Sequence, residues 1–92
     1  MIKSFRHRGL RELFETGRTK RISSDFCPKL LRQMDAINQA DFPEQLNFPG
    51  YELHGLKGEL AGVWAMKVNK NFRLTFKFVD GDAVDINLED YH

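Results

Sequence analysis

The sequence predicts an α+β fold in which an N-terminal strand and two helices precede a mainly antiparallel C-terminal sheet, with both helices packed on one face of it. Apolar residues recur at helical spacing in the first half of the chain, whereas they alternate with polar residues in the second half. The segment from Asp41 to Gly50, which holds Pro43 and Pro49, is expected to connect the two halves.

The first elements follow from local pattern. Met1 to Phe5 alternates apolar and polar residues, as a short edge strand does. A first helix of about three turns is expected to begin near His7 and to end by Gly17, because glycine is a usual C-terminal stop. Its inner side carries Leu10, Leu13 and Phe14.

A second helix is expected after the polar, basic loop from Thr19 to Ser23. Ser24 or Asp25 provides a side-chain cap, Pro28 is tolerated in the first turn, and the helix extends through Ala40. Its inner stripe comprises Leu30, Leu31, Met34 and Ile37.

Three alternating runs predict strands, and their apolar residues predict how the strands pair. Because the apolar side chains of one sheet share a face, Val68 must lie opposite Phe72, and Phe78 opposite Val84. Three-residue loops at 69–71 and 80–82 satisfy both pairings. A two-residue Asp80-Gly81 turn, the usual hairpin motif, is rejected because it places Lys77 opposite Val84.

The same register predicts the outer face of the sheet. Lys67 lies opposite Arg73, Arg73 opposite Glu89 and Lys77 opposite Asp85, with Thr75 and Asn87 one step further in. Two adjacent cations repel each other. Either a bound anion or the carboxylate of Glu89 is expected to offset that repulsion.

Composition limits the function classes. The chain has 92 residues, which fits one domain spanning residues 1–92, and its net charge is +1. A single cysteine, Cys27, excludes an internal disulfide and a cysteine-rich zinc site, and is interpreted as a small apolar filler. No apolar run is long enough for a membrane span or a signal peptide, so we expect a cytoplasmic protein without membrane contact.

Cationic residues form two local clusters despite the low net charge. The N-terminal cluster is opposed only by Glu12 and Glu15, and it predicts contact with nucleic-acid phosphates or simply a solvated face. It comprises Lys3, Arg6, Arg8, Arg11, Arg18, Lys20 and Arg21. The strand cluster comprises Lys67, Lys70, Arg73 and Lys77.

Three segments give the chain a resemblance to a known family. They are Met1-Ile2-Lys3-Ser4-Phe5 with Leu13-Phe14 and Gly17; Leu53-His54-Gly55-Leu56-Lys57-Gly58 with Gly62-Val63-Trp64; and Val68-Asn69, Phe72-Arg73-Leu74-Thr75-Phe76 and Asp90-Tyr91-His92. With the element order, they make the whole chain resemble the RelE superfamily of bacterial toxins, and more closely the HigB-type toxins.

The resemblance implies a RelE-like fold and an endoribonuclease that cuts mRNA on the translating 70S ribosome. It also implies a HigA-like helix-turn-helix antitoxin, whose complex with the toxin represses its own operon, so that operator DNA is reached only through the antitoxin. The N-terminal cluster would then grip ribosomal RNA through Arg6, Arg8, Arg11, Arg18, Lys20 and Arg21, with Lys67 and Lys70 as further RNA contacts.

The family's cleavage residues map onto His54, Lys57, Lys67, Arg73, Asp90, Tyr91 and His92. Many relatives carry arginine on the strand of Lys67, and lysine cannot form the bidentate fork that arginine makes with phosphate. We therefore expect weaker phosphate capture at Lys67 than at Arg73.

These residues suit RNA cleavage without a metal or cofactor. The 2′-hydroxyl attacks the adjacent phosphate, a step that needs a base, cations for the developing charge and an acid for the leaving oxygen. Arg73 and Lys57 are assigned to the phosphate, and His54 and His92 to proton transfer. Asp90 is assigned to orienting an imidazole or acting as base, and Tyr91 to stacking on a base or donating a proton.

Simpler interpretations remain for each residue. His54 is alternatively an exposed loop histidine, Lys57 a solvated turn lysine, Arg73 an ion-pair partner of Glu89, and the last three residues a frayed terminus. The alternative functions are a non-catalytic RNA- or ribosome-binding module and an inactive relative that only titrates an antitoxin. The ParE branch of the superfamily shares the fold but acts on gyrase.

Overall fold

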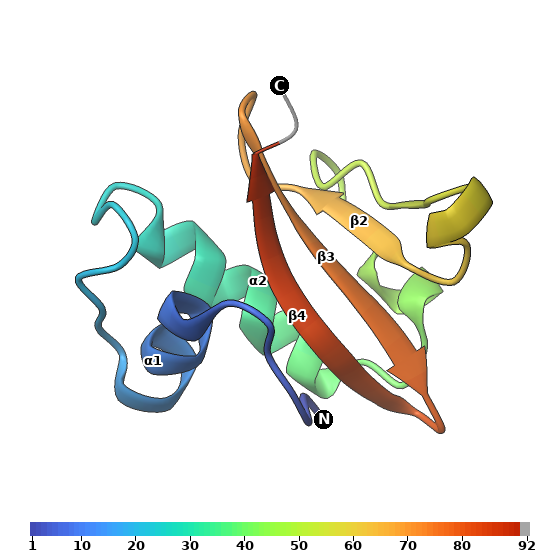
Figure 1. The fold of residues 1–92 in the computed structure, drawn as a ribbon, viewed down its shortest axis with the longest axis horizontal. Coiled ribbons are helices and arrows are strands. Elements are labelled where there is room, and N and C mark those ends of the chain that lie inside the picture. Colours follow the sequence, from blue (N-terminus) through green and yellow to red (C-terminus); the bar gives the residue numbers. More distant parts are fainter. Residues whose placement is uncertain (91–92) are drawn as a thin grey trace.

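The computed structural model describes residues 1–90 and confirms the α+β class. Two helices lie on one side of a four-stranded antiparallel sheet whose strands follow the order β1-β2-β3-β4 (Figure 1). The elements are α1 (Arg8–Thr16), α2 (Cys27–Gln39), the 3₁₀ turns η1 (Pro43–Leu46) and η2 (Gly58–Leu60), and strands β1 (His54–Gly55), β2 (Trp64–Lys67), β3 (Phe72–Val79) and β4 (Asp82–Asp90).

The core lies between the helices and the inner face of the sheet. Its fully buried members come from both helices and from three of the four strands. They are Leu10 and Leu13 of α1, Leu30, Met34 and Ile37 of α2, Met66 of β2, Leu74 and Phe76 of β3, and Ile86 of β4. Because burial of apolar area is the main favourable term in folding, this packing holds the sheet rigidly over the helices. The opposite face of the sheet is left to carry polar side chains.

Helix α1 has the predicted limits, and each end has a clear cause. At its start, the Nδ1 atom of His7 accepts a hydrogen bond of 3.2 Å from the Leu10 N–H, which satisfies an otherwise unpaired donor. At its end, Gly17 has φ of 84°, and its N–H binds the Leu13 carbonyl oxygen at 2.8 Å. Glycine suits this left-handed conformation because it lacks a Cβ atom.

Helix α2 begins later than predicted. Neither Ser24 nor Asp25 caps it; they form a turn, and the capping position falls on Phe26, which makes no side-chain cap. Pro28 occupies the first turn as expected, and the helix ends at Gln39 with Ala40 as C-cap. The ring of Phe26 packs instead against Phe72 of β3, with centroids 5.5 Å apart. Tertiary packing therefore sets this start rather than side-chain capping.

The β3–β4 hairpin corrects the predicted register at its turn. The strands are joined by the two-residue turn Asp80-Gly81. Its φ values of 51° and 86° are both positive, as the type I′ hairpin turn requires. Lys77 therefore lies opposite Val84, not opposite Asp85 as predicted, and Phe78 lies opposite Ala83, not opposite Val84. The predicted three-residue loop at 80–82 was also wrong.

A β-bulge explains why the parity argument failed there. Asp85 and Ile86 together face the single residue Phe76, and Asp85 has φ of 56°. The extra residue shifts the alternation by one, so that the fully buried Ala83 takes the inward place expected of Val84. Beyond the bulge, Thr75 lies opposite Asn87 and Arg73 opposite Glu89, as predicted.

The N-terminal segment runs parallel to β4 and supports the bulge (Figure 1). It forms two isolated bridges, Ile2 with Ala83 and Phe5 with Ile86, rather than a continuous strand. Between these bridges, the Ser4 Oγ atom accepts the Asp85 N–H at 2.9 Å and donates to the Asp85 carboxylate at 3.4 Å. The bulged backbone amide therefore finds its partner in a side chain.

Replacing Ser4 by alanine should destabilise the protein by about 1 kcal/mol, because the half-buried Asp85 N–H loses its acceptor. Urea-induced unfolding measures this change, and Ser24→Ala at an exposed position is the matched control. Equal unfolding midpoints for the two variants would show that the bulge does not depend on Ser4.

The His7 cap should make stability depend on pH. Burial, and secondarily the positive charge of Arg21, lower the pKa of His7 below its ordinary value of 6.5. The unfolded chain therefore binds a proton more readily than the folded one. The stabilisation is complete above the unfolded pKa and is lost as the pH falls through the folded pKa.

A His7→Asn variant keeps a capping side chain that does not titrate in this range. Wild type should therefore lose stability relative to this variant as the pH falls below 6.5 and through the lowered pKa of His7, as followed by urea unfolding. Parallel pH profiles for the two proteins would contradict this role of His7.

Candidate functional site

Three residues predicted from the sequence meet in one depression on the outer face of the sheet. The depression has a volume of about 180 Å³ and is lined by Glu52, His54, Lys67 and Arg73. His54 comes from β1, Lys67 from β2 and Arg73 from β3, while Glu52 lies just before β1. A titratable imidazole and two cations thus converge from three neighbouring strands.

Strand pairing explains why these side chains share a face. Lys67 lies directly opposite Arg73, as predicted, and β1 pairs with the other edge of β2, placing His54 opposite Ala65. Alternate residues of a strand point to the same face, so Ala65 and Lys67 share the outer face of β2. The interpretation of His54 as a loop histidine is wrong, because His54 and Gly55 form a short strand that extends this face.

A hydrogen bond to the backbone orients His54. Its Nδ1 atom lies 2.9 Å from the carbonyl oxygen of Glu52. A carbonyl oxygen can only accept, so Nδ1 carries the proton. In the neutral ring, Nε2 then holds the lone pair, and the exposed imidazole is set up to take a proton through that atom.

Each of the two cations contacts a carboxylate. The Lys67 Nζ atom lies 3.0 Å from Glu52 Oε2, and the Arg73 Nε atom lies 3.1 Å from Glu89 Oε1. The interpretation of Arg73 as an ion-pair partner of Glu89 is therefore correct in this structure. Both pairs offset the repulsion expected between Lys67 and Arg73.

Helix α2 holds the end of β2 from the inner side. Gln33 Nε2 donates to the Lys67 carbonyl oxygen at 2.9 Å, and Lys29 Nζ donates to the Val68 carbonyl oxygen at 2.5 Å. The Lys67 N–H in turn binds the Tyr51 carbonyl oxygen at 2.7 Å. The backbone beneath Lys67 is thus fixed on both sides.

Sequence reasoning missed Glu52, Gln33 and Lys29. A signal existed for Gln33, because it is a polar residue on the apolar stripe of α2 between Leu30 and Ile37, and it is fully buried. No local pattern marked Glu52, whose role follows from a left-handed backbone (φ of 49°) and from contacts with β1 and β2.

The C-terminal strand brings Asp90 to the same end of the sheet. Asp90 lies opposite Phe72, next to the Arg73–Glu89 pair. Strand alternation places it on the face opposite to that of Glu89. The predicted catalytic residues Tyr91 and His92 lie outside the described residues.

Two other predicted cations lie apart from the lining of the depression. Lys57 is exposed at the start of η2, two residues beyond β1. Lys70 is exposed in the β2–β3 turn, which lies at the same end of the molecule as the last residues of β4 (Figure 1).

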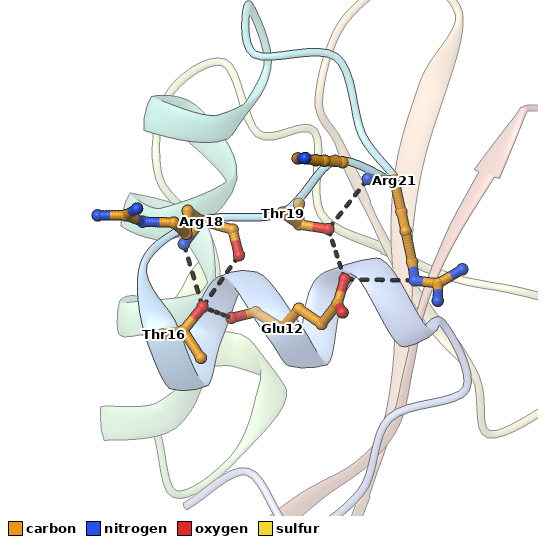
Figure 2. A pocket seen from close by; sticks show the side chains of 6 residues that line it. Glu12, Thr16, Arg18, Thr19 and Arg21 are labelled. Carbon is orange, nitrogen blue, oxygen red and sulfur yellow. Dashed lines mark hydrogen bonds and ion pairs between the residues drawn. The ribbon is translucent and has the colours of Figure 1, made fainter.

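The side chains of the N-terminal cluster are exposed, and six of them line two hollows. The larger, of about 510 Å³, follows α1 and is lined by Arg18, Lys20 and Arg21 together with Glu12, Thr16 and Thr19 (Figure 2). The smaller, of about 150 Å³, is lined by Arg6, Arg8 and Arg11 with Phe5 and His7.

Glu12 organises the larger hollow rather than merely opposing its charge. Its Oε1 atom accepts from Thr19 Oγ1 at 2.7 Å and pairs with Arg21 Nε at 3.3 Å (Figure 2). Thr19 Oγ1 also accepts the Arg21 N–H at 3.1 Å. The loop that carries the three basic residues is therefore fixed to α1.

Arg6 connects the N-terminal cluster with the sheet. It lines a narrow cavity of about 40 Å³ over the outer face, which Glu89 also lines. Glu89 in turn pairs with Arg73, so one ion pair links this cavity to the lining of the depression.

Residues 1–90 hold neither a cluster of metal ligands nor a helix that could span a membrane. No group of three or more His, Cys, Asp or Glu side chains lies close enough to hold a metal ion within that range. Over the same residues, neither helix has the length and apolar character needed to cross a bilayer.

The sequence is similar to those of known proteins along its whole length. The model of the HigB-like toxin family, described as the RelE-like toxin of the type II toxin–antitoxin system HigB, matches residues 3–92. Endoribonuclease HigB of Proteus vulgaris is 44% identical over 92 residues, 100% of both chains. Toxin HigB-1 of Vibrio cholerae serotype O1 is 31% identical over 91 residues, 97% of this chain and 96% of that protein. The chain therefore belongs to the HigB-like toxins, the RelE-like toxins of type II toxin–antitoxin systems.

Proposed function

We propose that this toxin is an endoribonuclease that cleaves mRNA held on the ribosome and so inhibits translation. The observation that carries the proposal is the convergence of His54, Lys67 and Arg73 in one depression on the sheet. An imidazole and two cations are groups that phosphodiester cleavage by an internal hydroxyl requires. The full-length similarity to a protein named endoribonuclease HigB supports the same activity.

The proposed reaction forms and breaks one bond at phosphorus. The 2′-oxygen of the RNA attacks the adjacent phosphate while His54 Nε2 takes its proton, and the bond to the 5′-oxygen breaks. Arg73 and Lys67 stabilise the additional negative charge on the phosphate oxygens. The products are a 2′,3′-cyclic phosphate and a 5′-hydroxyl.

The remaining predicted residues complete the proposal. His92 is the proposed acid for the leaving 5′-oxygen, Asp90 orients an imidazole or serves as base, and Tyr91 stacks on a splayed base or donates a proton. Lys57 is a further phosphate contact from the segment that follows β1. The reaction as written uses only side chains of the protein.

The N-terminal cluster and the partner proteins belong to the same proposal. Its exposed arginines and lysines, arranged around two hollows, suit contacts with ribosomal RNA phosphates, which position a protein without reading sequence. A ribosome-bound substrate places the reaction in the cytoplasm. The proposed antitoxin is a HigA-like helix-turn-helix protein that carries the complex to operator DNA.

Replacing Arg73 by glutamine should lower the rate of mRNA cleavage by about 10²- to 10³-fold, because a group that stabilises developing charge is lost. Arg32→Gln, on the exposed side of α2, is the matched control and should cleave like wild type. The measurement is single-turnover cleavage of an end-labelled mRNA on purified ribosomes, with both new RNA ends mapped.

Three outcomes separate the functions. New ends inside codons that disappear in Arg73→Gln agree with the proposal. Intact message bound to ribosomes with wild-type toxin indicates a non-catalytic binder. Equal cleavage by the Arg73 and Arg32 variants, with both folded by circular dichroism, would show that Arg73 does not act on the phosphate.

A further inference from the structure

We propose that Glu52 gates the phosphate site of this toxin. Its carboxylate occupies the place beside Lys67 that an RNA phosphate takes, and so sets the substrate concentration at which the site fills. The inference rests on the proposed RNA cleavage in this depression and adds to it a residue that competes with the substrate.

The contact between Glu52 and Lys67 has the geometry of a displaceable anion. Oε2 lies 3.0 Å from Nζ, and the two side chains are 64% and 40% exposed. Such exposed ion pairs are weak, because water solvates both partners nearly as well. The ammonium of lysine is a compact point charge that donates hydrogen bonds, and either a phosphate oxygen or a carboxylate oxygen can accept them.

The backbone of Glu52 lets the carboxylate leave without disturbing His54. The carbonyl oxygen of Glu52 holds His54 Nδ1 at 2.9 Å, and this contact is independent of the side-chain rotamer. The left-handed φ of 49° is uncommon for glutamate and directs carbonyl and carboxylate toward two different members of the site. Rotation of the side chain therefore moves the carboxylate away from Lys67 while the imidazole stays oriented.

The second ion pair of the site differs in the properties that matter for gating. Arg73 and Glu89 are 22% and 35% exposed and lie directly opposite each other on adjacent strands of the sheet. Burial and strand pairing favour a lasting contact in which Glu89 orients the guanidinium of Arg73. The exposed Glu52, which comes from the segment before β1, is the carboxylate that a phosphate can replace.

Two substitutions at position 52 test the gate in the full-length toxin. Glu52→Gln keeps the shape and removes the charge. Glu52→Asp keeps the charge but shortens the side chain by one methylene, and aspartate tolerates the left-handed conformation. Glu44→Gln, on the exposed face of η1, makes the same charge change away from the depression.

The primary readout is the half-saturating toxin concentration for cleavage of mRNA on purified ribosomes. It should fall about two- to fivefold for Glu52→Gln, as expected for loss of a competing exposed ion pair, and by a smaller factor for Glu52→Asp. The saturating rate constant should change less than the half-saturating concentration. The salt dependence of binding provides a second test. When the logarithm of the half-saturating concentration is plotted against the logarithm of the salt concentration, Glu52→Gln should steepen the slope by about 0.7.

A readout without the ribosome keeps this inference separable from the proposed function. Inorganic phosphate is titrated into isolated toxin while the Lys67 side-chain resonances are followed by NMR. Phosphate should bind Glu52→Gln about two- to fivefold more tightly than wild type or Glu44→Gln.

The outcomes decide each claim. Unchanged or weaker phosphate binding by Glu52→Gln overturns the gate, even where Arg73→Gln abolishes cleavage and so supports the proposed function. If Glu52→Gln binds phosphate more tightly but wild type cleaves no mRNA, Glu52 does control phosphate binding and the proposed function is overturned. Equal effects of Glu44→Gln and Glu52→Gln would reduce the effect to net charge and also overturn the gate.

Discussion

The cross-strand alignment of Lys67, Arg73 and Glu89 is the constraint on which the candidate site depends. Moving β2 or β4 by one residue would send one of these side chains into the core and bring an apolar side chain out. The apolar residues beneath them, among them Met66 and Leu74, make that exchange costly. Burial on one face of the sheet therefore determines the chemistry displayed on the other.

The β-bulge at Asp85 reconciles two local preferences that conflict. Asp80-Gly81 favours a two-residue turn, whereas the apolar pattern of β4 near Glu89 requires the opposite parity. One extra residue satisfies both, and Ser4 from the other end of the chain accepts the bulged amide. The N-terminal segment thereby helps to fix the strand register that aligns Arg73 with Glu89 at the far end of the hairpin.

The cationic side chains of the site are paired with carboxylates of the same chain. Lys67 with Glu52 and Arg73 with Glu89 form two ion pairs around an imidazole whose tautomer is set by a backbone carbonyl. Under the proposed function, this arrangement keeps the depression nearly neutral until a phosphate arrives. Much of the catalytic effect would then depend on the ribosome and mRNA to position the phosphate.

The sequence by itself determined the fold class, the limits of α1 and the apolar members of the inner stripe of α2. It also determined the pairing of Lys67 with Arg73 and of Arg73 with Glu89. Each of these follows from apolar periodicity or a terminal glycine. The alternating pattern also singled out Lys67 and Arg73, and the family resemblance singled out His54. Only the tertiary structure decided the bulge at Asp85, the late start of α2 and the places of Glu52 and Gln33. These features depend on contacts between segments far apart in the chain, such as Ser4 with Asp85 and Gln33 with Lys67, and local periodicity carries no information about such contacts.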